Sequence, residues 1–185
     1  MNIQPTLETP RLRLRPFQLN DAPTVQHLAG AREIAAVTLN IPHPYEDGMA
    51  ETFIASLEGA WQDGRGATFA IALRESGELV GCMGLGVDKR FNRAELGYWI
   101  GLPFWGEGYA TEAARAIIEF GFQTLKLHRI YASHLEGNPA SGRVQEKIGM
   151  KYEGCLRDHY LKWGQYHNAH FRGILVTEWD TETSC

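Results

Sequence analysis

A short glycine-rich stretch separates a predicted strand from the longest predicted helix of this chain. Residues 94–100 have the alternation of a strand, and residues 108–125 place apolar side chains at helical spacing. Between them, Gly106 and Gly108 allow a tight loop whose backbone N–H groups converge on an anion beside the positive end of a helix dipole. This order predicts a phosphate or pyrophosphate site. The alternative is a loop that only turns the chain.

Two common phosphate-binding motifs are absent from the sequence. No Lys-Ser or Lys-Thr follows a G-x-x-x-x-G spacing, and no G-x-G-x-x-G opens a helix, so a P-loop and a dinucleotide-binding fold are both excluded. Glu107 and Glu112 lie beside the glycines. These carboxylates indicate that backbone donors, and not side-chain charge, would hold the anion.

Strands and helices are predicted on both sides of the loop. The predicted strands cover residues 11–15, 67–73, 79–87, 94–100, 130–134, 152–161 and 169–177. The predicted helices cover about residues 20–30, 49–61, 108–125 and 138–149, with a loop over 40–48. Turn signals favour an antiparallel meander for the second to fourth strands, and Trp163-Gly164-Gln165 favours a final hairpin. Pro16 ends the first strand and favours an edge position for it.

This order predicts an α+β fold. We expect a single domain over residues 1–185, with a central mixed, mostly antiparallel twisted sheet of about seven strands flanked by about four helices.

Two of these helices have recognisable caps. Asn20 or Asp21 is placed to cap the first helix. Asn138 followed by Pro139 is the usual start of a helix. Gly149 ends that helix, and Met150 is placed for the hydrophobic contact of a Schellman motif.

Composition argues against several classes of function. Eighteen Lys and Arg against 22 Asp and Glu give a net charge of −4, so direct binding of nucleic acid or anionic lipid is not expected. No apolar run approaches the roughly 18 residues of a membrane helix, and no apolar targeting stretch opens the chain. We therefore expect a cytoplasmic protein without a membrane partner.

The spacing of the cysteines and histidines also favours a cytoplasmic protein and argues against a metal site. Cys82, Cys155 and Cys185 are too scattered for a disulfide framework, which favours a reducing compartment. His167 and His170 are three residues apart in a predicted strand, where they point to opposite faces. We expect no metal site.

Glu95 is a candidate general base. Along its strand, Glu95, Gly97 and Trp99 point to the face opposite Leu96, Tyr98 and Ile100. The small side chain of Gly97 leaves room beside the carboxylate for a substrate amine. The alternative is a surface carboxylate paired across the hairpin with Lys89, Arg90 or Arg93. Asn138 and Ser141 also have ordinary explanations, as a helix cap and a first-turn serine.

Three stretches taken together resemble a known family. They are residues 94–100 (AELGYWI), 105–113 (WGEGYATEA) and 138–150 (NPASGRVQEKIGM). Their types and order are similar to the GNAT N-acetyltransferase superfamily, and within it to the Rim-type ribosomal-protein acetyltransferases. The opening LETPRLRLRP (residues 7–16) and Glu153-Gly154 before the final hairpin match that branch, so the resemblance covers nearly the whole chain.

The resemblance implies a GNAT-like fold with acetyl-CoA as cofactor and coenzyme A as product. It places the pyrophosphate on the backbone of a loop that comprises Gly106, Glu107, Gly108, Tyr109, Ala110 and Thr111. It places pantetheine like an extra strand beside Ile100 and Leu102, and the thioester near Asn138 and Ser141. Trp105 is a departure, because the superfamily usually starts this loop with Gln or Arg. A homodimer is compatible with the branch.

For such an enzyme we expect direct acetyl transfer to a primary amine, most simply a protein N-terminus or a ribosomal-protein amine. The amine is mostly protonated at neutral pH, so a base must act first, and Glu95 is the candidate. A backbone N–H near Leu102 would polarise the thioester carbonyl, and Ser141 would protonate the departing thiolate. His159 and Tyr160 are reserve candidates.

Two other functions stay open at this point. One is the same chemistry on a small molecule such as a polyamine, an amino acid or an aminoglycoside, because the acceptor pocket has no readable sequence code. The other is a non-catalytic module that binds acyl-CoA.

Overall fold

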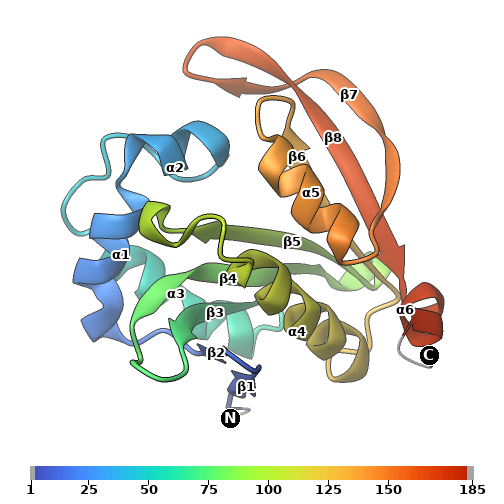
Figure 1. The fold of residues 1–185 in the computed structure, drawn as a ribbon, viewed down its shortest axis with the longest axis horizontal. Helices are drawn as coiled ribbons and strands as arrows, with labels where there is room; N and C mark the ends of the chain where they lie inside the picture. The colour runs from blue at the N-terminus through green and yellow to red at the C-terminus, as the bar shows by residue number, and fades with distance from the viewer. Residues whose placement is uncertain (1–2, 183–185) are drawn as a thin grey trace.

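A computed structural model describes residues 3–182, and in it a single twisted sheet is covered by helices (Figure 1). In spatial order its strands are β1 (Leu7–Glu8), β2 (Leu12–Arg15), β3 (Gly66–Leu73), β4 (Leu79–Asp88), β5 (Arg93–Ile100), β6 (Arg129–Leu135), β8 (Gln165–Leu175) and β7 (Lys151–Lys162). All neighbours are antiparallel except β5 and β6. The α+β class, the meander and the final hairpin are confirmed, with eight strands among the described residues in place of about seven.

Six α-helices lie within residues 3–182. They are α1 (Ala22–Ala29), α2 (Arg32–Val37), α3 (Met49–Gln62), α4 (Tyr109–Gln123), α5 (Pro139–Lys147) and α6 (Val176–Glu182), and three short 3-10 turns are η1 (Leu19–Asp21), η2 (Lys89–Phe91) and η3 (Leu102–Phe104). Four of the helices were predicted. The strand expected over 169–177 is wrong at its end, because α6 begins at Val176, and the six-residue α2 is too short to show a periodic pattern.

One local prediction near the N-terminus is wrong, and another is confirmed only in position. The strand at residues 11–15 is not an edge, because the two-residue β1 pairs with it, Leu7 opposite Leu14. Asp21 is the N-cap residue of α1, as predicted, but its carboxylate makes no capping hydrogen bond to that helix. It instead accepts hydrogen bonds from Arg15 (2.7 and 2.8 Å) and from the Gln18 backbone N–H (2.8 Å). The ion pair with Arg15 takes the side chain away from the cap.

The caps predicted for α5 are confirmed. The Asn138 side-chain oxygen accepts the Ser141 backbone N–H at 3.1 Å, and Pro139 is the first helical residue. Gly149 has a φ of +82°, and its N–H donates to Glu146 while Met150 N–H donates to Gln145, both at 3.0 Å. These two bonds form a Schellman motif. The residues that form each of these two caps lie within a few positions of one another in the sequence.

The two faces of the sheet carry different helices. One core cluster joins α1 and α3 to the face of the sheet that holds Cys82 and Trp99. The other joins α4 to the face that holds Leu96 and Ile100. The alternation predicted for β5 is therefore confirmed, because Trp99 and Leu96 pack on opposite faces.

β5 and β6 are paired over only part of their lengths. Parallel pairing joins residues 93–95 to residues 129–131, and the paired register ends at Glu95. Figure 1 shows β5 and β6 diverging beyond this point, with β8 and β7 continuing as a long ribbon that arches toward α2. The sheet therefore opens at its centre, between Glu95 and the end of β5.

Several other expectations bear on the described residues. No helix within residues 3–182 has the length and apolar character needed to cross a membrane. The same residues hold no group of three or more His, Cys, Asp and Glu placed to bind a metal ion. Cys82 and Cys155 are free thiols, and Cys185 lies outside the described residues.

Candidate active site

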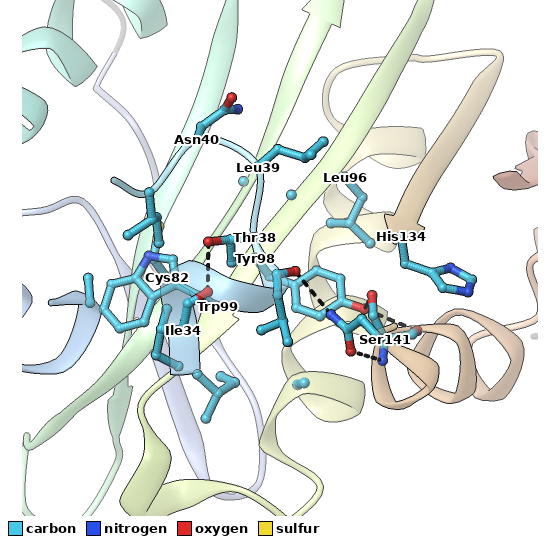
Figure 2. A pocket seen from close by; sticks show the side chains of 18 of the residues that line it. Ile34, Thr38, Leu39, Asn40, Cys82, Leu96, Tyr98, Trp99, His134 and Ser141 are labelled. Carbon is cyan, nitrogen blue, oxygen red and sulfur yellow. Dashed lines mark hydrogen bonds between the residues drawn. The ribbon is translucent and has the colours of Figure 1, made fainter. Parts of the chain in front are cut away.

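The opening between β5 and β6 leads into a cavity of about 1700 Å³. Its wall is formed by the loop after α2, by β5, by the loop before α4, by the end of β6, by the first half of α5 and by Tyr160 of β7. Figure 2 shows side chains from four of these segments around one space, with labels on Thr38, Leu39 and Asn40 after α2, Leu96 and Tyr98 of β5, His134 of β6 and Ser141 of α5. Because the cavity passes between two diverging strands, it reaches both faces of the sheet.

The predicted phosphate loop, residues 106–111, forms one end of the cavity. Gly106 and Gly108 have φ values of +87° and +81°, a conformation that only glycine adopts readily, and Gly108 is the N-cap of α4. Gly106, Gly108, Tyr109, Ala110 and Thr111 line the cavity. The glycines are therefore required by the backbone, and the start of the longest helix faces the cavity as predicted.

Arg11 holds this loop from outside. Its guanidinium donates to the Glu107 carbonyl at 3.0 Å and to the Glu112 carboxylate at 2.7 Å, and it lies 4.8 Å from the centre of the Tyr109 ring. Glu112 also accepts the hydroxyl of Thr9 at 2.7 Å. Glu107 thus binds Arg11 through its carbonyl oxygen and is not among the residues that line the cavity.

The segment between β5 and the loop contains Ile100, Leu102 and Trp105. Ile100 and Trp105 line the cavity, and the Trp105 indole N–H donates to the Ile100 carbonyl at 2.6 Å. Leu102 packs against the cluster around α1. A cofactor contact at Leu102 through its backbone stays a prediction, and Trp105 ties the start of the loop back to the end of β5.

Glu95 lies on the face of β5 that carries α1 and α3, where it lines the cavity. The Ser133 hydroxyl donates to its carboxylate at 3.2 Å and lies 3.3 Å from the Tyr160 hydroxyl. Arg93, proposed above as its alternative partner, pairs instead with Asp88 at 3.2 Å. At the cavity wall the Glu95 carboxylate is therefore bonded to the Ser133 hydroxyl, and within residues 3–182 it forms no ion pair.

The two reserve candidates differ in position. A bulge in β7 between Leu156 and Tyr160, where Asp158 has a φ of +50°, turns Tyr160 toward the cavity. His159 is exposed and stacks edge-on against Tyr160, with ring centres 4.6 Å apart. Of this pair, only Tyr160 is brought near Glu95.

Ser141 lines the cavity from α5, on the opposite face of β5 from Glu95. Its hydroxyl lies 2.7 Å from the hydroxyl of Tyr98 (Figure 2). It also lies 3.2 Å from the amide nitrogen of Gln145. Burial raises the pKa of Tyr98 to about 12, against the smaller lowering effect of its bonds to Ser141 and Gln145. Tyr98 is therefore protonated at neutral pH, and Glu95 and Ser141 approach the cavity from its two sides.

The other end of the cavity is covered by α2 and the loop after it. Asn138 donates its amide N–H to the Val37 carbonyl at 3.2 Å. Lys162, only 9% exposed near the tip of the β7–β8 hairpin, donates to the carbonyls of Ala35 and Thr38. The C-terminal end of α2 is thus bound both by α5 and by the hairpin.

A family model described as an acetyltransferase (GNAT) domain matches residues 11–151 of the chain. The chain belongs to the GNAT family of acetyltransferases. An uncharacterized N-acetyltransferase p20 of Bacillus licheniformis is 31% identical over 176 residues, which cover 94% of this chain and 98% of the relative. A putative ribosomal N-acetyltransferase YdaF of Bacillus subtilis is 34% identical over 74% of each chain.

Structural comparison agrees. A GNAT-family acetyltransferase structure from Bacillus anthracis has a TM-score of 0.83 and 26% identity, covering 94% of this chain and 99% of the other. This GNAT chain is therefore an acetyl-CoA-dependent acetyltransferase.

Several contacts in this acetyltransferase have no signal in its sequence. Arg11 and Glu112 are 101 residues apart, and Lys162 and Ala35 are 127 apart. Tyr98 and Gln145 fit ordinary strand and helix patterns. Only the Arg-rich opening stretch, shared with the Rim-type branch, pointed toward Arg11.

Proposed function

We propose that this protein transfers the acetyl group of acetyl-CoA directly to a primary amine, with Glu95 as general base and Ser141 as general acid. The observation that carries the proposal is that these residues line one cavity from opposite faces of β5. The amine would enter from the α2 side, and the thioester from the α4 side. The unpaired edge of β5 and the glycine loop fit an extended pantetheine and its pyrophosphate.

Each residue then has one chemical role. Glu95 takes a proton from the ammonium form of the acceptor, and the free amine attacks the thioester carbonyl. The new C–N bond forms, the C–S bond breaks, and the proton of Ser141 goes to the departing sulfur. No covalent enzyme intermediate is needed. Cys82 lines the cavity, but burial raises the pKa of its thiol to about 12, so it is protonated at neutral pH, and Cys155 does not line the cavity.

For the acceptor, we propose an amine of a protein, most simply a ribosomal-protein N-terminus. YdaF is named as a putative ribosomal N-acetyltransferase, and an Escherichia coli relative, 31% identical over half of this chain, is named for alanine of ribosomal protein uS5. A ribosomal L7/L12 α-N-protein acetyltransferase solved with coenzyme A has the same fold, with a TM-score of 0.85 at 16% identity. The cytoplasmic location and a homodimer stay predictions.

A small polyamine is the second candidate acceptor. Glu46, Asp47 and Glu95 line the cavity, and carboxylates attract a multiply charged amine. The fold is also shared with a spermidine N-acetyltransferase chimera at 21% identity and a TM-score of 0.77.

Thiol release from acetyl-CoA tests these functions directly. We would compare peptides copied from ribosomal-protein N-termini, the same peptides with blocked N-termini, and spermidine. Release only with free N-terminal peptides supports the proposal, and release only with spermidine supports the second candidate. Binding of acetyl-CoA without release in any arm would contradict both proposed acceptors.

A further inference from the structure

Gln145 is a fully buried polar side chain on α5, one helical turn after Ser141. Its amide nitrogen lies 3.2 Å from the Ser141 hydroxyl and 3.4 Å from the Ser133 carbonyl, and its amide oxygen lies 2.8 Å from Nδ1 of His134. Burial of an amide is costly unless its groups are hydrogen-bonded, and a leucine here would carry no such cost. The bonds to Ser141, Ser133 and His134 therefore offset the cost of burying this amide.

The direction of each bond follows from the partners. The Ser133 carbonyl can only accept, so the NH₂ group of Gln145 faces Ser133 and Ser141. Its oxygen then faces His134, and the proton of that ring lies on Nδ1. Burial lowers the pKa of His134 below its usual value, and the charges of His170 and Arg172 lower it further, against the raising effect of Gln145. The ring is neutral at neutral pH, with a defined tautomer.

Gly142 leaves space in α5 for the His134 ring. A Cβ atom at Gly142 would lie 2.9 Å from Nε2 of His134. Glycine inside a helix costs up to about 1 kcal/mol relative to alanine. Gly142 therefore lowers the stability of α5 but allows the His134 imidazole to approach the helix.

The Ser141 hydroxyl receives bonds on more than one side. Such a hydroxyl has one proton to donate and two sites that accept. Gln145 occupies one accepting site. Tyr98 is protonated, and its hydroxyl lies 2.7 Å from the Ser141 hydroxyl and 3.3 Å from the Ser141 carbonyl, so its one proton fills the other accepting site when it is donated to the nearer oxygen. When both donate, the proton of Ser141 is left to point into the cavity.

We propose that His134 acts through Gln145, together with Tyr98, to orient the Ser141 hydroxyl so that its proton faces the departing sulfur. This inference rests on the proposed function. During transfer the C–N bond forms, the C–S bond breaks with its electron pair going to sulfur, and the Ser141 proton moves to that sulfur. Solvent restores the proton of Ser141, while His134, Gln145 and Tyr98 keep theirs. These three are positioning residues.

Double-mutant analysis tests the pathway. We would measure kcat, the acceptor KM and the acetyl-CoA Kd for Ser141→Ala, Gln145→Leu and the double variant. Gln145→Leu should lower kcat about tenfold, part of the 10²–10⁴ typical of a general acid, with Kd and KM unchanged. In the Ser141→Ala background it should lower kcat no further. An equal loss in both backgrounds, or no loss in either, overturns the inference.

A matched pair at His134 gives an independent readout. His134→Asn retains an N–H near the position of Nδ1 and should keep most of the turnover, whereas His134→Leu should resemble Gln145→Leu. Equal turnover in the two variants, both folded by thermal unfolding, overturns the pathway. If Gln145→Leu does not fold, Tyr98→Phe replaces it in the double-mutant analysis, with the same non-additivity expected.

The controls separate this inference from the function itself. Wild-type protein that releases no thiol with any amine would overturn the proposed transfer and this inference together. Wild-type activity that is unaffected by Ser141→Ala would remove the acid role and this inference but leave transfer by Glu95 standing. Loss in Ser141→Ala without loss in Gln145→Leu overturns the positioning role alone.

Discussion

The two ends of the cavity are built in different ways. The end proposed for the coenzyme consists mainly of backbone from one continuous stretch, residues 100–111, with two glycines in a left-handed conformation. The end proposed for the acceptor is assembled from side chains of α2, β5, β6 and the β7–β8 hairpin, which are far apart in the chain. A backbone site can be kept by a short motif, whereas a side-chain site can change without altering the fold.

The largest effect should come from the acceptor end. Glu95→Gln keeps size and polarity but cannot take a proton, so turnover should fall about 10²- to 10⁴-fold at an unchanged acetyl-CoA Kd. Rates at neutral pH with a saturating acceptor measure the effect.

The matched control for Glu95 is Glu119→Gln on the exposed side of α4, where Glu119 bonds to the neighbouring Gln123. It should leave the rate unchanged. Wild-type rates in Glu95→Gln at neutral pH would remove the base assignment, and Tyr160, the nearer of the two reserve residues, would be tested next.

At the coenzyme end, Gly108→Val should weaken acetyl-CoA binding at least about tenfold. A Cβ at Gly108 would touch only Arg11, at 3.6 Å, so the penalty comes from the φ of +81° and not from a clash. A β-branched residue disfavours that conformation by about 1–2 kcal/mol, and relaxing it turns the loop N–H groups apart. Calorimetry measures the affinity.

Gly59→Val is the control for this substitution, because Gly59 has an ordinary φ and open space around it on α3. Its acetyl-CoA affinity should match the wild type. An unchanged affinity in folded Gly108→Val would refute the loop assignment.

The same contrast explains what could be predicted from the sequence. The glycine loop, the caps of α5 and the alternation of β5 are all local, because the residues that cause them lie within a few positions of each other. Packing between distant segments decides the rest. Nothing near Lys162 in the sequence indicates that its ammonium is buried against α2, and nothing near Gln145 indicates His134 as its partner.

Glu95 and Ser141 lie between these two cases. Their strand and helix could be predicted, and so could the face of β5 on which Glu95 lies. The sequence alone left Glu95 with a possible pairing to Arg93, which the structure replaces with Ser133 at 3.2 Å. The opening of the sheet next to Glu95 was not visible in either strand's pattern, because divergence of β5 and β6 depends on what packs between them.

Arg11→Ala sharpens the comparison at the coenzyme end. Removal of its bond to the Glu107 carbonyl, worth about 1 kcal/mol, should weaken acetyl-CoA binding about fivefold while the acceptor KM stays the same. Arg13→Ala is a close control, because the two side chains are both 49% exposed and Arg13 pairs with Glu8 on the neighbouring strand, away from the loop. Equal affinities in the two variants would show that the loop holds its shape without Arg11.

The smallest effect is expected at Lys162, and it should change only the KM for the acceptor. Lys162→Met keeps the length of the side chain but removes the ammonium that bonds to the carbonyls of Ala35 and Thr38, so α2 and the hairpin are held together less firmly. We expect an acceptor KM raised by about two- to threefold, the equivalent of a few tenths of a kcal/mol, with an unchanged acetyl-CoA Kd. Stability should change little, because burying the ammonium is itself costly and methionine does not carry that cost.

Lys151→Met is the control for Lys162→Met. Lys151 lies at the other end of β7 and pairs with Glu178, so this variant should leave both constants unchanged. A shift in acetyl-CoA Kd with no shift in acceptor KM would mean that the hairpin belongs to the coenzyme end, and the division of the cavity into two differently built ends would then be wrong.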